Sequence, residues 1–178
     1  KAAGLGRDPF VYPPYTRIEV IQYYYVCGEI VGDSTKQGVP GDQLAYNFKI
    51  TNRGNGPDQG IATIFTGNLT WEVLLTPDNF NLPALNDPGF EQTGQFLVTI
   101  PIGTRILTYD YNVNISSVVP LTPICTLRFH VKVNQVYIPY VTQPAAQSGQ
   151  VGLEVNFEFT VRNAGNGLDQ LIVEITVL

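Results

Sequence analysis

The chain has 178 residues, of which 44% are apolar and only 14% are charged, against roughly 25% charged residues in an average soluble domain. Its net charge is −5 and it contains no basic run, which argues against nucleic-acid binding through phosphate neutralisation. No apolar stretch approaches the ~20 residues of a membrane-spanning helix, and the length accommodates one large β domain or two small ones.

Residues 1–16 are expected to form an extended N-terminal arm. Lys1–Asp8 is polar and contains glycine, whereas Phe10–Tyr15 is aromatic and holds two adjacent prolines. Proline lacks the amide donor that an interior strand needs, so this segment is not expected inside a sheet. Its apolar side chains need a surface to cover, on this subunit or on another.

The segment 17–133 is predicted to form a series of β-strands. Apolar and polar residues alternate with a period of two, and no stretch shows a helical period. Together with residues 134–178, the pattern predicts an all-β sandwich of about ten strands. Strands are predicted over residues 17–31, 42–52, 61–66, 68–76, 95–101, 104–115 and 124–133, with loops over 32–41 and 77–94.

A strand–turn–strand unit occurs twice in the sequence. Asn52–Gln59 and Asn163–Gln170 share the pattern Asn-x-Gly-Asn-Gly-x-Asp-Gln and differ only at the second and sixth positions. Glycine and asparagine turn the chain because they tolerate positive φ at little cost. The flanking strands are predicted over 44–51 and 61–66 for the first copy, and over 153–162 and 171–178 for the second.

The second copy lies in a segment, 134–178, where the pattern restarts. Val136–Tyr140 echoes Val11–Tyr15 in residue types. Several predicted strands follow the first copy, but none follows the second. Two accounts remain open: both copies pair within one sandwich, or residues 134–178 are a second, incomplete unit. In the second account a strand from elsewhere would close the open sheet edge.

The two cysteines, Cys27 and Cys125, have no further Cys or His at metal-ligand spacing. In a seven-strand sandwich the first and last strands lie side by side, and these residues would fall on them. A disulfide there would contribute roughly 4–5 kcal/mol on the chain-entropy model. The alternative is a pair of buried free thiols.

The repeated turn between an alternating strand and an apolar strand resembles the CARDB-like, immunoglobulin-like modules of bacterial and archaeal surface proteins. The residues that carry the resemblance are 46–64 and 157–175. It implies an extracellular immunoglobulin-like β-sandwich with an adhesive or structural role. The short second unit and the aromatic arm also resemble subunits of archaeal threads and pili, which polymerise by donating a strand to a neighbour. Neither resemblance implies catalytic residues or a cofactor.

No pattern of catalytic residues emerges. The single histidine, His130, alternates out of phase with the apolar residues of its strand, which places it on the solvent side. A Ser–His–Asp triad would have to include it. A glycosidase would need paired carboxylates, but the candidates do not share a motif. They are Asp78, Asp87, Glu91 and Asp110. We therefore expect a protein that is not an enzyme.

Binding sites and modifications remain as hypotheses. Asp58 and Asp169 close the two turns and are predicted to bond to the turns' own amides, with calcium as the alternative. Asn68 and Asn114 begin N-glycosylation triplets. Two roles are open for the aromatic residues: a sugar-stacking platform, or the filling of a core or an interface. The platform candidates are Trp71, Tyr109 and Tyr111.

The sequence therefore favours a secreted structural subunit of a filament or surface layer. We expect a homopolymer in which residues about 8 to 26 of one subunit lie against residues 136–178 of another. The alternatives are a carbohydrate- or surface-binding module and a viral coat protein. The expected subunit-interface residues are Phe10, Val11, Tyr12, Tyr15, Ile18, Val20, Tyr137 and Tyr140.

Overall fold

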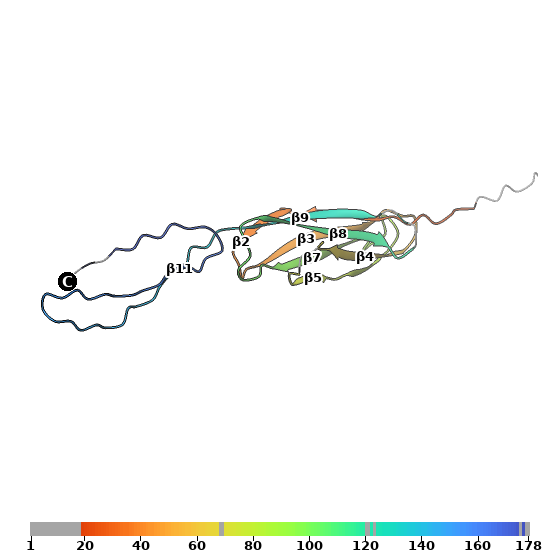
Figure 1. Ribbon diagram of the computed structural model, residues 1–178. Coiled ribbons are helices and arrows are strands. Elements are labelled where there is room, and N and C mark those ends of the chain that lie inside the picture. The colour runs from red at the N-terminus through yellow and green to blue at the C-terminus, as the bar shows by residue number, and fades with distance from the viewer. Residues whose placement is uncertain (1–18, 68–69, 120–121, 123, 175, 177–178) are drawn as a thin grey trace, which may run out of the picture.

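The computed structural model describes residues 19–67, 70–119, 122, 124–174 and 176. All regular secondary structure within these residues is strand, so the predicted all-β class is confirmed. Figure 1 shows an elongated molecule with a β-sandwich in the middle and a C-terminal segment extending from one end. Among the described residues there is no helix that is long and apolar enough to cross a membrane.

Two sheets face each other across a common core. The first has the strand order β1-β3-β7-β5 and is antiparallel throughout. The second has the order β2-β9-β8-β4-β6. The first sheet contains β1 (Val26–Val31), β3 (Gln43–Asn52), β5 (Val73–Thr76) and β7 (Glu91–Thr99). The second contains β2 (Thr35–Gly38), β4 (Asp58–Phe65), β6 (Asn79–Leu82), β8 (Thr108–Ser117) and β9 (Cys125–Val133).

The first two strands of the chain, β1 and β2, lie in different sheets. β1 pairs with β3 antiparallel, whereas β2, which follows directly, pairs with β9 in parallel. Gly32 redirects the chain between them with a φ of 87°, which glycine adopts without steric cost. The sequence predicted one strand over 17–31 and a loop over 32–41. Among the described residues, the regular strand instead begins at Val26, and β2 lies inside the predicted loop.

A second short strand, β6, lies inside the predicted loop 77–94. It pairs with β4 at the edge of the second sheet and places Phe80 and Leu82 in the core. Two alternating apolar residues are too few to identify a strand from the sequence. The loop assignment was therefore wrong for residues 79–82, and this short strand extends the second sheet.

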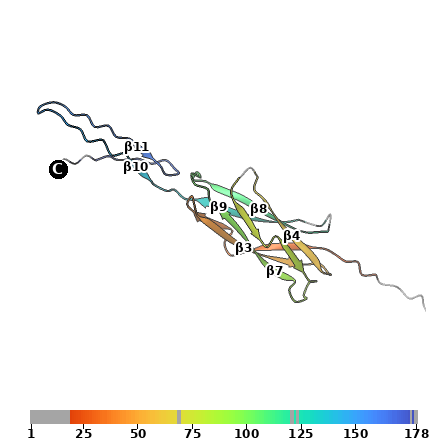
Figure 2. The same cartoon turned by 90° about the horizontal axis from the view of Figure 1, so that it is seen from below.

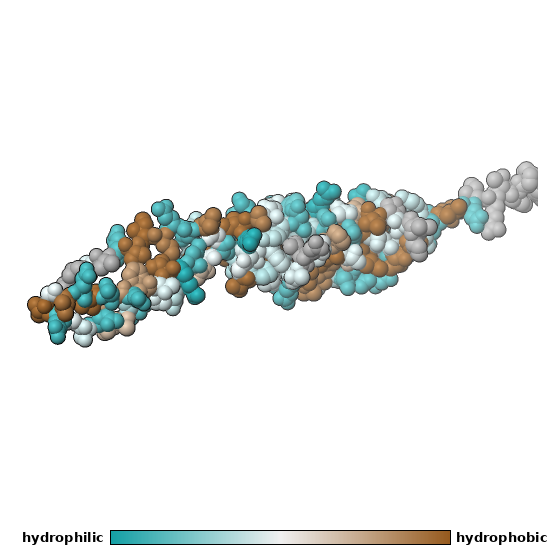
Figure 3. Space-filling view, viewed as in Figure 1, coloured by the Kyte–Doolittle hydropathy of each residue, from teal (hydrophilic) through white to brown (hydrophobic). Residues whose placement is uncertain are grey.

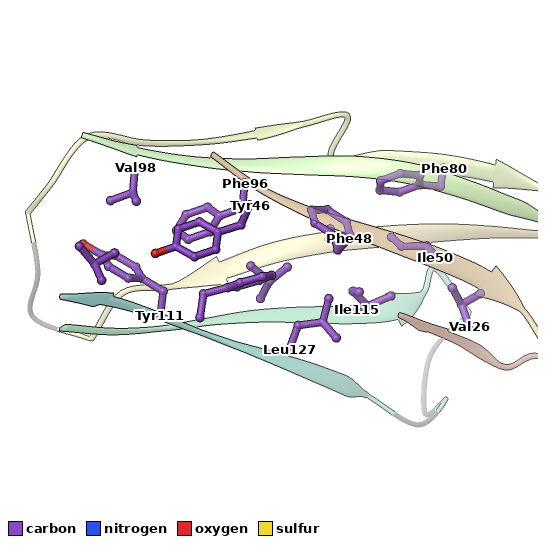
Figure 4. Packing of buried hydrophobic residues seen from close by; sticks show 14 of the residues in the cluster. Val26, Tyr46, Phe48, Ile50, Phe80, Phe96, Val98, Tyr111, Ile115 and Leu127 are labelled. Atoms are coloured by element: carbon purple, nitrogen blue, oxygen red, sulfur yellow. The ribbon is translucent and has the colours of Figure 1, made fainter. Parts of the chain in front are cut away.

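Large aromatic side chains from both sheets fill the middle of the core (Figure 4). Tyr46 and Phe96 from the first sheet pack against Phe129 and Tyr111 from the second, with ring centroids 5.1 to 5.4 Å apart. All four side chains are fully buried. Tilted and offset ring pairs at such distances stabilise a core beyond the area that they bury. Apolar residues alternate along β3, β7, β8 and β9 because every second side chain of these strands points into this core.

A disulfide joins Cys27 of β1 to Cys125 of β9, with a Cα–Cα distance of 5.2 Å. The two strands lie in different sheets rather than side by side in one sheet. The bond therefore ties the two layers together at their shared edge. It also closes a long loop, because the cysteines are 98 residues apart in the sequence.

Two buried tyrosines offer a matched test of the core. The Tyr46 hydroxyl donates to the main-chain oxygen of His130 at 2.7 Å, whereas the Tyr111 hydroxyl has no partner in the described part of the chain. Burial raises the pKa of Tyr46 to about 12 and also raises the pKa of Tyr111, so both phenols stay neutral.

We expect Tyr46→Phe to lower the free energy of unfolding by about 0.5–1.5 kcal/mol, because a hydrogen bond is lost. Tyr111→Phe should leave it unchanged or raise it, because a buried hydroxyl without a partner is removed. Chemical denaturation of the two variants measures the difference. Equal losses in both would contradict this account of the core.

The C-terminal segment has less regular structure than the sequence predicts. Of the strands expected over 153–162 and 171–178, the described residues contain only β11 (Val161–Asn163), paired antiparallel with β10 (Pro139–Val141). β3 lies between β1 and β7, but β11 pairs with β10 alone. An isolated pair of strands is only marginally stable in water, because independent stability takes three or more strands with a hydrophobic face or packing against another element. Figure 2 shows this pair beyond the end of the sandwich.

Candidate functional site

The candidate catalytic residues do not come together. His130 Nδ1 lies 2.6 Å from Asp110 Oδ1 across β9 and β8, on the outer face of the second sheet. His130 contacts Ser34 through the main chain only: the amide of His130 donates to the main-chain oxygen of Ser34. No group of three metal-binding side chains occurs among the described residues. This arrangement is a cross-strand pair on an exposed surface.

Two of the remaining acidic candidates, Glu91 and Asp78, have local structural roles. Glu91 and Glu29 both pair with Lys49, at 3.1 and 2.9 Å, on the outer face of the first sheet. The hydrogen bond between Lys49 and Glu29 raises the pKa of the lysine and lowers that of the glutamate. Asp78 Oδ1 accepts from Asn79 Nδ2 at 2.8 Å. These contacts connect strands or shape a turn, and none of them makes a pair of facing carboxylates.

The two aspartates that close the turns have matching contacts. Asp58 Oδ1 accepts from the amide of Gln59 at 2.7 Å, and Asp169 Oδ1 accepts from the amide of Gln170 at 2.8 Å. Asp58 Oδ1 also accepts from the hydroxyl of Ser117 at 2.7 Å. These are the turn contacts that the sequence favoured over calcium binding.

The predicted aromatic platform is part of the core and its margin. Tyr111 is fully buried, and Trp71 packs on Tyr109 with ring centroids 4.5 Å apart. Trp71 and Tyr109 are themselves partly buried against the core cluster. A sugar ring would need an exposed aromatic face, and these rings face one another.

The two glycosylation candidates lie in different situations. Asn68 lies outside the described residues. Asn114 lies within β8, between Thr63 of β4 and Thr126 of β9. Its side-chain oxygen accepts from the Thr126 hydroxyl at 2.8 Å. Glycosylation of either residue stays a prediction.

The repeated turn has the same internal geometry in both copies. Asn52 Oδ1 accepts from the amide of Gly54 at 2.8 Å, and its Nδ2 donates to Gly56 O at 2.9 Å. In the second copy, Asn163 Oδ1 accepts from Gly165 at 2.8 Å, and its Nδ2 donates to Gly167 O at 2.6 Å. The first asparagine of each motif therefore closes its own turn.

The second asparagine of each motif holds the segment that leads into the unit. Asn55 Oδ1 accepts from the amide of Tyr23 at 2.6 Å, and its Nδ2 donates to Ile21 O at 3.0 Å. We call residues 21–25 the first leading segment. The main-chain amides of Arg53 and Asn55 also donate to Tyr25 O and Tyr23 O, so the segment is held against the turn, and the regular strand begins only after it, at Val26.

The second leading segment, residues 134–138, is bound in the same way. Asn166 Oδ1 accepts from the amide of Val136 at 2.7 Å, and its Nδ2 donates to Asn134 O at 3.0 Å. A Cβ on Gly165 would collide with Val136 O, just as a Cβ on Gly54 would collide with Tyr23 O. Both glycines are therefore required by close main-chain approach.

A glutamine completes each pair of contacts. Gln22 Nε2 donates to Pro57 O at 3.0 Å, and Gln135 Nε2 donates to Leu168 O at 2.6 Å. The structural counterpart of residues 134–138 is therefore 21–25, whereas Val11–Tyr15, the segment that echoes Val136–Tyr140 in sequence, lies outside the described residues. The glutamine that the two segments share could have identified this correspondence from the sequence. It was missed because its distance from the repeated motif differs by two residues between the copies.

The two copies differ in what covers the first asparagine. Asn52 is fully buried, and its Nδ2 also reaches Leu82 O and Pro83 O, at 3.3 and 2.7 Å. Those acceptors belong to the end of β6 and the residue after it. Asn163 is exposed and lacks such acceptors among the described residues. The second copy thus has the same turn as the first, but it lacks the sheet that packs against the turn in the first copy.

Two aromatic residues before the second turn are exposed, whereas their counterparts before the first turn are buried. Tyr46 and Phe48 have no exposed surface, but Phe157 and Phe159 are 54% and 40% exposed. We call the alternating apolar residues of the second copy the apolar stripe. Figure 3 shows apolar surface on this end of the molecule. The stripe consists of Leu153, Val155, Phe157 and Phe159, all of them exposed.

The expected interface residues are described only in part. Val20, Tyr137 and Tyr140 are exposed, and the Arg162 guanidinium lies 4.6 Å above the Tyr140 ring. The other expected interface residues, Phe10, Val11, Tyr12, Tyr15 and Ile18, lie outside the described residues.

Comparison with known proteins is informative for the fold only. No protein-family model matches the sequence, and no curated protein matches it. Among solved structures, a CARDB domain from Pyrococcus furiosus aligns at 16% identity over 65% of this chain and 100% of that chain, with a TM-score of 0.40. The sandwich is immunoglobulin-like. The solved structures that align with this chain thus include a CARDB domain.

Two further matches are an adhesin and a chaperone. The SrpA adhesin of Streptococcus sanguinis aligns at 15% identity over 62% of this chain and 58% of that chain, with a TM-score of 0.42. The Escherichia coli chaperone DraB aligns at 9% identity over 62% and 54%, with a TM-score of 0.43. The immunoglobulin-like chain thus spans little more than half the length of these two proteins, and the likeness assigns no activity or partner to it.

Proposed function

We propose that this immunoglobulin-like protein is a structural subunit of an extracellular filament or surface layer. We further propose that residues 134–178 are an incomplete second unit, which a strand from another subunit completes. One observation carries this proposal. The same strand–turn–strand pattern is buried between two sheets in its first copy and exposed, with few main-chain partners, in its second copy.

The exposed apolar stripe favours association of the C-terminal segment with another subunit, because association would remove these side chains from water. Removing an exposed phenylalanine side chain from water stabilises an assembly by about 1.5–3 kcal/mol. Phe157 and Phe159 lie on the same face of an extended segment, and their counterparts Tyr46 and Phe48 face the core. An added strand would also bond to the open main-chain edge, which is a common mode of recognition.

The N-terminal arm is the proposed donor, within narrower limits than the sequence suggested. Residues 21–25 are bound to the turn of their own sandwich, so the donated segment ends before Ile21. Val20 is 80% exposed and available. In the sequence, Arg17–Val20 alternates as His130–Val133 does in β9, which suits a strand that adds to a sheet edge.

Extracellular location is supported by the disulfide and the composition. Disulfides such as Cys27–Cys125 persist in oxidising compartments and are rare in the cytosol. The low content of charged residues leaves the surface largely to neutral polar side chains. Both features support the proposed location at the cell surface.

Deleting residues 1–16 should abolish self-association, because the aromatic donor segment is lost. Sedimentation velocity together with negative-stain microscopy checks this outcome. Deleting only residues 1–7, which contain no aromatic residue, is the matched control and should leave assembly intact. Assembly that survives the longer deletion rules the arm out as donor. An intact protein that stays monomeric at high concentration overturns the filament proposal.

A further inference from the structure

A loop of the sandwich binds to the second turn of the same chain. We call residues 103–106, which lie between β7 and β8, the pole loop. Asn166 Nδ2 donates to the main-chain oxygen of Thr104 in this loop at 3.1 Å, and to that of Asn134 at 3.0 Å. The side-chain amide has two hydrogens, so both donations are made at once. One side chain of the second turn therefore bridges the sandwich and the segment that leaves it.

The pole loop is anchored to the sandwich by its own hydrogen bonds. The Thr104 hydroxyl donates to Pro101 O at 2.6 Å, which closes the turn that leads into the loop. The Tyr109 hydroxyl, from β8, donates to Arg105 O at 3.2 Å. The loop therefore holds the Thr104 carbonyl in a fixed place on the sandwich.

An apolar contact lies beside the polar one. The side chain of Ile106 lies over Gly167 of the second turn, so close that a Cβ on this glycine would collide with it. An open groove flanks the contact and is lined in part by Gly103, Arg105 and Leu168. The two surfaces therefore do not share a packed core, and a few side chains hold them together.

No free linker separates the sandwich from the second unit. The residue after β9 is Asn134, whose amide donates to Gly38 O of β2 at 2.8 Å. The carbonyl of Asn134 accepts from Asn166, and the next two residues, Gln135 and Val136, are also bound to the second turn. A hinge needs residues whose φ and ψ are free to change. The residues that leave the sandwich are instead held on both sides.

The contact with the pole loop is not part of the repeated turn itself. Asn55, the counterpart of Asn166, accepts from the amide of Tyr23 and donates to Ile21 O in the same way. Among the described residues, Ile21 O is the only acceptor of its Nδ2. The donation to Thr104 O is therefore an addition that joins the second turn to the sandwich.

We propose that the pole loop and the second turn form a rigid joint, which fixes the direction of the second turn and of the β10–β11 pair relative to the sandwich. A single covalent connection would let these elements swing, whereas two further contacts beside it resist rotation. The joint stands whether or not the N-terminal arm is a donor. One consequence rests on the proposed function: in a filament, the angle between neighbouring subunits would be set in part within each subunit.

The distance between two spin labels on the full chain tests the joint. Thr63 on the sandwich and Gln170 after the second turn are both exposed. The substitutions Thr63→Cys and Gln170→Cys can be labelled selectively, because the native cysteines are joined in a disulfide. Labelled protein is diluted in an excess of unlabelled protein, so that pulsed electron resonance measures distances within one chain. We expect one narrow distance distribution. A broad distribution would overturn the proposal, whereas sedimentation velocity reports separately on assembly.

Two pairs of variants assign the rigidity to the named contacts. Asn166→Ala removes the donor to Thr104 O and should abolish the narrow distribution, whereas Asn55→Ala removes the same local contacts at the first turn and should leave it narrow. Ile106→Ala leaves the second turn intact and should also abolish it. Leu107→Ala, at the exposed residue next to Ile106, is the matched control and should not. Equal thermal melts confirm that the sandwich is folded in all four variants. A narrow distribution in Asn166→Ala or Ile106→Ala, or equal broadening in a control, would overturn the joint.

Discussion

Replacing both cysteines by alanine is expected to lower the free energy of unfolding of the sandwich by about 4–5 kcal/mol. Cys27 and Cys125 are 98 residues apart, so the disulfide removes a large loop-closure entropy from the unfolded chain. Domains of this size are stable by only about 5–15 kcal/mol, so the double variant would lie near the limit of folding. Denaturant unfolding of the oxidised protein and the variant measures the loss.

The position of the disulfide adds to the reason for expecting a large effect. β1 and β9 belong to different sheets and share no main-chain ladder, so side-chain packing and the disulfide hold them together. The wild-type protein under reducing conditions is the matched control and should lose about as much stability as the double variant. A loss below about 1 kcal/mol would mean that the unfolded chain gains little freedom when the bond is removed.

The sequence predicted the central strands because each has one buried face. Alternation placed strands over 42–52 and 124–133, and the structure has β3 at Gln43–Asn52 and β9 at Cys125–Val133. The short strands β2 and β6 could not be predicted, because four residues give too little pattern. β2 in particular is defined by its parallel main-chain pairing with β9.

The repeated turn was recognisable from its residues, but its binding partner was not. The leading segments offer main-chain groups to Asn55 and Asn166, and any non-proline residue carries such groups. The pattern of side chains therefore does not predict which segment of the chain binds to each asparagine. Over residues 153–162 the alternation of side chains defines which face of the segment would be buried. It does not define which strands would cover that face.

Phe48 and Phe159 occupy the same position before the two repeated turns, and their substitution should separate core from interface. Phe48 is fully buried against Phe80, with ring centroids 6.1 Å apart, whereas Phe159 is 40% exposed. Phe48→Ala should lower the free energy of unfolding of the sandwich by about 3–5 kcal/mol, because a large cavity is left. Denaturant unfolding measures this loss.

Phe159→Ala should change the stability of the sandwich by no more than about 0.5 kcal/mol, because its side chain adds nothing to that core. It should nevertheless weaken self-association in sedimentation velocity, since it removes part of the apolar stripe. Val151→Ala is the matched control, because Val151 is fully exposed in the loop before the stripe and should leave association unchanged. Association that is equally strong in all three proteins would contradict a role for the stripe. A large loss of sandwich stability in Phe159→Ala would instead place this residue in a core shared with the first unit.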